Sequence, residues 1–231
     1  MLLTSSRTQS RRSDAVTLVC AHRGGREFAP EGTLDAYRSA LAVGADFVEV
    51  DVRRRADGEL VCGHDTLLGA EPLLREVLEL IADAGRSAHI DLKETGYEDE
   101  LVGIVGGYGL RRVLYTIGDE ASVRALRAAG GEALLTLGPD LADRPLLAAV
   151  RELIGVAIPF SRIGASNACG VAAQFRLAGP VLRWWCRRRG LALLVWTVND
   201  DRRLRRFLDV RGVTAVVTDR PGHALKLRTQ R

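Results

Sequence analysis

Short apolar runs rich in β-branched residues alternate with segments of helical periodicity along almost the whole chain. The apolar runs predict eight strands, at Thr17–Ala21, Phe47–Val52, Ala88–Leu92, Val113–Ile117, Ala133–Leu137, Gly155–Pro159, Ala192–Val198 and Thr214–Thr218. The segments between and after them predict eight helices, at Thr33–Val43, Leu73–Ala84, Asp99–Gly106, Glu120–Ala129, Ala142–Leu153, Gln174–Arg189, Asp200–Val210 and Gly222–Leu227. Short strands that alternate with helices are typical of parallel βαβ units.

Eight strands favour an α/β fold of the (β/α)8 barrel type, with an open doubly wound sheet as the alternative. The chain has 231 residues, close to the roughly 250 of a one-domain barrel. The first 15 residues are polar and rich in Arg and Ser, which predicts a disordered arm before a single domain over residues 16–231.

Composition narrows the function classes only slightly. The net charge of +4 suits a phosphate-bearing substrate or an anionic membrane surface, and no nucleic-acid recognition motif is present. Much of the Arg content lies in short clusters, which are most simply solvated helix faces. The four Cys have no metal-ligand spacing, and neither a secretory signal nor an 18-residue apolar stretch appears. A cytoplasmic enzyme is therefore the expectation.

The strand predicted at Phe47–Val52 carries two acidic residues on one face. Glu49 and Asp51 are two positions apart, so their side chains point the same way and alternate with valines. Two desolvated carboxylates need a cation beside them. A hard divalent ion such as Mg2+ or Ca2+ would satisfy both, and a salt bridge to Arg53 or Arg54 is the structural alternative.

Histidines stand near this strand in the chain. His22 and Arg23 directly follow the first strand and precede two glycines, which allow a ligand to approach the backbone closely. The Asp57-Gly58 turn predicts a hairpin that returns His64 and Asp65 towards the acidic strand. A lone His after a strand is more often structural, and a His-Asp dipeptide is common by chance, so each feature depends on its context.

Two further segments add charged groups near the same expected barrel mouth. Asp91 and Lys93 share one face at the end of the third strand, and supply a third carboxylate and a cation for phosphate. His89 has the same parity but lies deeper, as a packed or supporting residue. Glu31 precedes the first helix, where a simple interaction with the helix dipole is the alternative.

Taken together, these motifs resemble the glycerophosphodiester phosphodiesterase family. The resemblance rests on His-Arg-Gly, Pro-Glu-x-Thr, Glu-x-Asp, Asp-Gly and His-Asp between Ala21 and Asp65, followed by Ile90–Lys93, Val195–Asp200 and Val217–Pro221. It implies a barrel that hydrolyses glycerophosphodiesters to glycerol 3-phosphate and an alcohol, with one divalent cation, Mg2+ or Ca2+. The roles implied are acid–base catalysis by His22 and His64, metal binding by Glu49, Asp51 and Asp91, and substrate contact by Arg23, Glu31, Lys93 and Trp196.

The chain departs from the family pattern in three places. Gly32 replaces the usual Asn, Asp91 replaces the usual Glu, and the insertion after His-Asp is nearly absent. The short insertion predicts a more open mouth and makes lysolipids conceivable substrates. One alternative is a lysophospholipase D-like or sphingomyelinase-like enzyme in peripheral contact with a membrane, which Trp184-Trp185 beside Arg187–Arg189 would suit. The other is a barrel that binds metal and phosphate without turnover.

Overall fold

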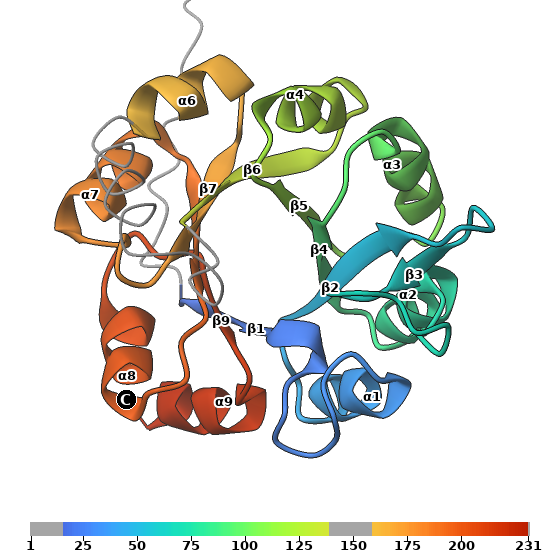
Figure 1. Cartoon of the computed structure of the whole chain (residues 1–231). Helices are drawn as coiled ribbons and strands as arrows, with labels where there is room; N and C mark the ends of the chain where they lie inside the picture. The colour runs from blue at the N-terminus through green and yellow to red at the C-terminus, as the bar shows by residue number, and fades with distance from the viewer. Residues whose placement is uncertain (1–15, 139–158, 231) are drawn as a thin grey trace, which may run out of the picture.

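The computed structural model describes residues 16–138 and 159–230, and within them eight parallel strands close into a barrel (Figure 1). Strand β1 pairs with both β2 and β9, which closes the ring. The barrel strands are β1 (Leu18–Ala21), β2 (Phe47–Arg54), β4 (Ser87–Leu92), β5 (Val113–Ile117), β6 (Glu132–Leu137), β7 (Gly170–Gln174), β8 (Ala192–Trp196) and β9 (Ala215–Thr218). The expected (β/α)8 barrel is confirmed, and the open-sheet alternative is wrong.

Helices surround the strands, as Figure 1 shows. Their bounds are α1 (Leu34–Ala42), α2 (Leu74–Asp83), α3 (Glu98–Gly106), α4 (Glu120–Ala128), α6 (Pro159–Ser166), α7 (Pro180–Arg189), α8 (Asp201–Asp209) and α9 (Pro221–Thr229), with a short 3-10 helix, η1, at His22–Gly24. Side-chain caps fix several starts: the Thr33 hydroxyl accepts from the Ala36 amide, and the Asp200 carboxylate accepts from the Arg203 amide. None of these helices is long and apolar enough to cross a bilayer.

The sixth barrel strand is not where the sequence pattern placed it. Residues 155–158 of the predicted strand lie outside the described residues, as does the predicted helix Ala142–Leu153, and Pro159 begins α6. The barrel position is taken by β7 instead, and α7 begins at Pro180 rather than at Gln174. Small residues make β7 inconspicuous in the sequence, but packing demands them. A Cβ on Gly170 would lie 2.5 Å from the Ala192 carbonyl oxygen.

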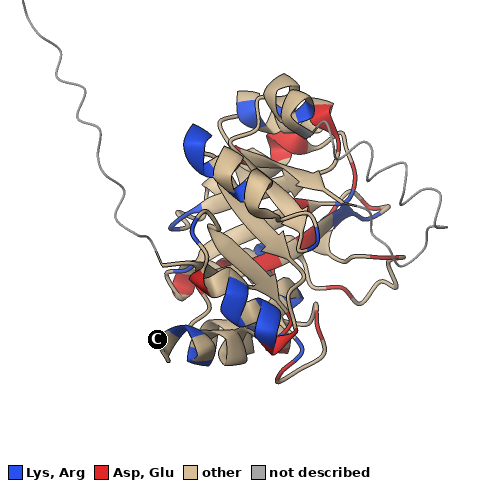
Figure 2. Cartoon of the chain, turned by 90° about the vertical axis from the view of Figure 1, so that its left-hand side faces the viewer, with Lys and Arg blue, Asp and Glu red and all other residues tan. Residues whose placement is uncertain are grey.

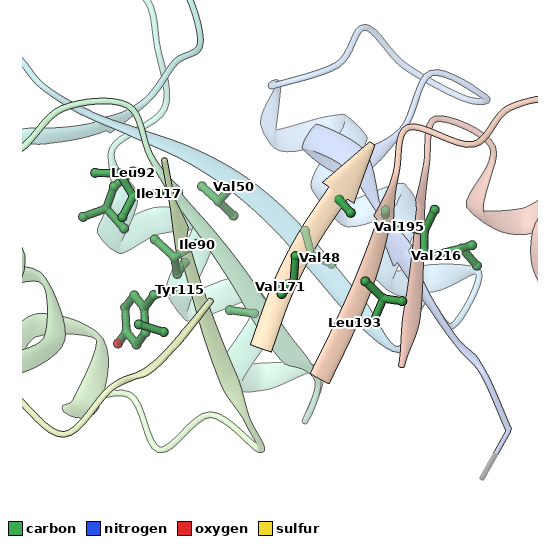
Figure 3. Close-up of a cluster of buried hydrophobic side chains, with 14 of the residues drawn as sticks. Val48, Val50, Ile90, Leu92, Tyr115, Ile117, Val171, Leu193, Val195 and Val216 are labelled. Atoms are coloured by element: carbon green, nitrogen blue, oxygen red, sulfur yellow. The ribbon is translucent and has the colours of Figure 1, made fainter. Parts of the chain in front are cut away.

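Alternating strand positions supply two separate apolar cores. The outer core lies between strands and helices, and Figure 3 shows part of it, with Val50 of β2 beside Ile90 of β4. The inner core fills the barrel with the opposite set of positions: Cys20, Phe47, Leu114, Leu134, Ala172, Leu194, Ala215 and Val217. Polar residues follow these inner positions towards the carboxyl ends of the strands, so the barrel interior changes from apolar to polar along its axis.

Strand β3 (Leu60–Cys62) pairs antiparallel with the end of β2, with Val52 opposite Cys62. This is the expected hairpin, and it carries the chain back to the barrel mouth. The amide of Gly63 then donates to the carbonyl of Asp51 at 3.0 Å. The hairpin therefore places the residue that follows Gly63 directly beside the acidic strand.

Candidate active site

A cavity of about 240 Å3 opens at the polar end of the barrel. Its wall includes most of the residues that the sequence predicts for a site: His22, Arg23, Glu49, His64, Asp91, Lys93 and Trp196. Asp51 lies directly behind this wall, 2% exposed and in contact with two of the lining cations. Residues from β2, β4 and β8, from the end of β1 and from the hairpin thus meet at one place, as the carboxyl ends of parallel barrel strands require.

Three carboxylates form the most buried part of the site. One oxygen from each of Glu49, Asp51 and Asp91 lies within 4.8 Å of the others. Asp51 and Asp91 are register partners on adjacent strands, and Glu49 is two residues earlier on β2. Burial, and then the charges of its two acidic neighbours, raise the pKa of Glu49 well above its usual range. The cluster is therefore an unfavourable concentration of negative charge unless cations adjoin it.

Two cations lie beside the cluster, and they are not Arg53 and Arg54, the salt-bridge partners that the sequence suggested. The Arg23 Nε lies 2.7 Å from one Asp51 oxygen, and Lys93 Nζ lies 2.8 Å from the other. Lys93 also reaches Asp91 at 2.5 Å. Although burial opposes ionisation, these two cations lower the pKa of Asp51 to about 2. With all three carboxylates ionised, the cluster and its partners carry three negative and two positive charges, so one negative charge would remain for a further cation.

Arg53 and Arg54, the alternative partners for the acidic strand, point elsewhere. Arg53 pairs with Glu94, and Arg54 pairs with Glu100, each with a nitrogen–oxygen distance of 2.5 Å. Both lie at the end of β2, beyond the inward-facing carboxylates, and β3 pairs with this part of the strand. The interpretation of the acidic strand as satisfied by its own neighbouring arginines is therefore wrong.

His22 and His64 each face a carboxylate through Nδ1. The distance is 2.6 Å from His22 to Asp219, at the end of β9, and 2.7 Å from His64 to Asp65. Asp219 is held in turn by Asn199, whose side-chain amide donates to it at 2.7 Å. Burial acts in the other direction, but the hydrogen bonds from His22 and Asn199 keep the pKa of Asp219 below its usual value.

Comparison with known proteins agrees with this arrangement. The model of the glycerophosphoryl diester phosphodiesterase family matches residues 22–97, the segment from His22 past Lys93. A glycerophosphodiester phosphodiesterase of Caldanaerobacter subterraneus is 25% identical over 91% of this chain and 97% of its own length. The chain thus resembles the glycerophosphodiester phosphodiesterase family over this segment, and an enzyme of that name over nearly its whole length. The resemblance and the enzyme class expected from the motifs are thereby confirmed.

Solved structures of the family share the fold. A glycerophosphodiester phosphodiesterase from Agrobacterium tumefaciens has a TM-score of 0.71 at 22% identity, covering 94% of this chain and all of that one. An Oleispira antarctica phosphodiesterase in complex with the product sn-glycerol-3-phosphate has a TM-score of 0.73 at 20% identity, covering 92% of this chain and 96% of that one. At these identities the likeness supports the barrel fold alone.

The loop after β1 is built around a strained turn. Arg23 has a φ of 50°, in the left-handed region, and its amide donates to Glu49 at 2.7 Å. Gly24 has a φ of 80°, and a Cβ there would lie 2.6 Å from the backbone of Ala36. The turn therefore needs glycine at position 24, and it brings both the backbone and the side chain of Arg23 to the carboxylates.

Glu31 has a supporting position beside this loop. It accepts from Arg23 at 3.2 Å and from Arg26 at 2.6 Å. Glu31 also lies within 4.8 Å of potential ligand atoms of His22 and Asp219, a second group able to hold an ion. Glu31 is already paired with Arg23 and Arg26, and His22 and Asp219 are paired with each other. Among the described residues, the buried cluster of three carboxylates therefore fits a metal better.

A chain of hydrogen bonds that sequence reasoning missed fixes Asp91 from behind. The hydroxyl of Thr116, on β5, donates to Asp91 and accepts from His89 Nε2 at 2.8 Å. Burial lowers the pKa of His89 to about 4, so its ring is neutral near pH 7. His89 is thus the packed, supporting residue expected. The one sequence signal that could have indicated Thr116 is its position two residues after Leu114, which places both side chains on the inner face of the strand.

Proposed function

We propose that this chain hydrolyses glycerophosphodiesters to glycerol 3-phosphate and an alcohol by metal-assisted acid–base catalysis. The observation that carries the proposal is the presence of His22 and His64 in the wall of one cavity with the acidic cluster and Lys93. A phosphodiester in this cavity would meet two proton carriers together with cationic groups. The bound product in the Oleispira antarctica relative is the compound that the proposed reaction would release.

The acidic cluster fits a divalent metal by the chemistry of its donors. Glu49, Asp51 and Asp91 offer carboxylate oxygens, which Mg2+ and Ca2+ prefer. With all three ionised, the cluster keeps one negative charge after pairing with Arg23 and Lys93. A metal held there would polarise a phosphoryl oxygen and offset charge that develops on it. The shorter Asp91 keeps its carboxylate in the cluster despite replacing the family's usual Glu.

Arg23 and Lys93 would orient the phosphate from the same side. Both line the cavity, and both are fixed by ion pairs to Asp51, so neither needs to rearrange when an anion enters. Preorganised cations of this kind stabilise the transition state more than mobile ones, because their reorganisation is already complete. Glu31 acts one step away, by holding the guanidinium of Arg23.

The histidines would move the protons. Because Nδ1 of His22 and His64 faces Asp219 and Asp65 respectively, Nε2 is the nitrogen of each ring that would exchange a proton with substrate. One histidine takes a proton from the nucleophile, either water or the neighbouring glycerol hydroxyl, while the other protonates the leaving oxygen of the alcohol. On the second route the cyclic phosphate is then opened by water. Transfers of this type each contribute roughly 10²–10⁴-fold in rate.

Release of glycerol 3-phosphate from glycerophosphocholine tests the proposal. Activity is expected with Mg2+ or Ca2+, loss after EDTA, and recovery on adding the metal back. His22→Asn and His64→Asn should each lose at least about 100-fold in kcat. His223→Asn is the matched control, because His223 pairs with Asp201 outside the cavity. Full activity in EDTA or in His22→Asn contradicts the mechanism, and metal binding without turnover of any diester favours the non-catalytic alternative.

A second candidate is action on a lipid such as a lysophospholipid or sphingomyelin. Apolar side chains stand exposed in the loops that follow the two catalytic histidines: Phe28 is 60% exposed and Leu68 88%. Trp184 on α7 is 55% exposed with Arg188 over its ring at 5.7 Å. Its neighbour Trp185 packs on Phe160 instead. The side of the molecule that carries α7 and α8 faces the viewer in Figure 2, with Lys and Arg in blue.

Vesicles separate this candidate from the first. If the exposed aromatic and cationic groups contact a membrane, the protein should co-sediment with vesicles containing phosphatidylglycerol, and Trp184→Ala should weaken that binding severalfold. Lysophosphatidylcholine should then be hydrolysed at a rate comparable with glycerophosphocholine. Absence of both vesicle binding and lysolipid turnover would eliminate the lipid candidate and leave the first.

A further inference from the structure

Two neutral polar atoms in the cavity wall have no assigned use in the proposed reaction. The Thr136 hydroxyl and the Trp196 indole nitrogen are both buried, and neither has a hydrogen-bond partner within the described part of the chain. Both residues line the same cavity as the catalytic histidines. Buried polar groups are nearly always paired, so two unpaired ones in one cavity indicate a group that arrives from outside.

The two residues lie on the wall away from the charged groups. Thr136 is on β6 and Trp196 on β8, whereas the predicted metal and phosphate ligands come from β1, β2 and β4 and their ends (Figure 1). Ala172 of β7 lies between them, in register with Thr136, and also lines the cavity. Its single methyl group leaves space between Thr136 and Trp196 that a larger side chain would fill.

The chemistry of the pair selects its ligand. An indole N–H can only donate, whereas a threonine hydroxyl can donate or accept. A hydroxyl group satisfies both, because it accepts from Trp196 while donating to Thr136. A choline headgroup or a hydrocarbon chain cannot do this. A carboxylate could accept from both groups, but its charge would lie on a wall away from the cations Arg23 and Lys93.

We propose that Thr136 and Trp196 bind the terminal hydroxyl of the substrate's glycerol moiety. This rests on the proposed function, which places the phosphate beside Arg23 and Lys93. Of the two glycerol hydroxyls, the terminal one is separated from phosphorus by more bonds, so it is the one that reaches the opposite wall. Thr136 is then a specificity-determining residue, and the site prefers a free glycerol end over a 1-acyl lysolipid, in which this hydroxyl is esterified.

A pair of matched substrates tests the contact. Glycerophosphocholine and 2-hydroxypropyl phosphocholine differ only in the terminal hydroxyl, and both keep the middle one. Wild-type kcat/KM should be at least about tenfold higher for glycerophosphocholine, because the analogue leaves two buried polar groups unpaired. In Thr136→Val, which keeps the side-chain shape, that ratio should fall by about tenfold, and Thr136→Ser should restore it.

The ratio distinguishes specificity from a structural effect. If Thr136→Val lowers kcat/KM equally for both substrates, or for neither, the assignment of Thr136 is wrong. Should the wild type hydrolyse neither substrate, the proposed function fails, and the contact is decided by calorimetry with glycerol 3-phosphate and 2-hydroxypropyl phosphate. About tenfold tighter binding of glycerol 3-phosphate, lost in Thr136→Val, supports the contact; equal affinities overturn it.

Discussion

Replacement of Asp219 by Asn should disable His22 while leaving its position intact. One carboxylate oxygen of Asp219 lies 2.6 Å from Nδ1 of His22, and the other accepts a hydrogen bond from the Asn199 side-chain amide at 2.7 Å. In Asp219→Asn, the amide oxygen would remain on the Asn199 side, where a donor faces it. The new amide nitrogen would then point at His22 Nδ1 and donate to it. This forces the ring proton onto Nε2, the nitrogen that must accept a proton from the nucleophile.

The size of the effect follows from the hydrogen bond that is lost. A hydrogen bond to a charged partner contributes about 1.5–3 kcal/mol, and its loss from the transition state lowers kcat by about 10–150-fold. The wrong tautomer adds to this, up to the roughly 10⁴-fold ceiling for one acid–base group. The KM should change little, because Asp219 is not among the residues that line the cavity.

Steady-state release of glycerol 3-phosphate at saturating glycerophosphocholine gives the required kcat. The chain offers a matched control in Asp201→Asn, since Asp201 also accepts from a histidine, His223, but outside the cavity. Thermal melts of both variants exclude unfolding as the cause. A kcat for Asp219→Asn within twofold of wild type, or an equal loss in Asp201→Asn, would refute the role given to the His22–Asp219 pair.

Three further predictions concern binding and stability. Mg2+ or Ca2+ should raise the Tm in a concentration-dependent manner, and Glu49→Gln should remove most of that rise, as followed by scanning calorimetry against EDTA. Gly24→Ala combines a positive φ with a backbone clash and should cost roughly 2–5 kcal/mol in urea unfolding, against about 1–2 kcal/mol for Gly58→Ala, which has a positive φ but open space. Although burial opposes ionisation, the neighbouring cations hold the pKa of Asp51 at about 2, below its value in the unfolded chain. The ionised Asp51 therefore stabilises the fold above about pH 4, and this contribution is lost towards pH 2. In EDTA, Asp51→Asn should flatten the pH dependence of the unfolding free energy between these two values.

Local sequence carried the information for those elements whose pattern depends only on periodicity. Strand β2 is an example, because the alternation of valines with Glu49 and Asp51 determines both the strand and which face is polar. Strand β7 is the counterexample. Its Gly and Ala residues carry no strand signal, yet the close approach of Gly170 to Ala192 requires small side chains there. Such a requirement exists only after neighbouring strands have paired.

For the candidate site too, local motifs indicated the residue types, and only the fold indicated their partners. The residue types for acid–base and metal chemistry were evident from the sequence, because His22, Glu49, Asp51 and His64 stand in short motifs. Their partners were not, since contacts such as His22–Asp219 join positions 197 residues apart in the chain.

The sequence by itself thus determined the barrel, the family resemblance and the candidate reactive groups of this protein. Only the closed barrel decided what neutralises the acidic cluster, what holds each histidine, and which polar atoms remain for substrate. The physical reason is that periodicity is local, whereas ion pairing and hydrogen-bond satisfaction depend on which strand ends meet in space.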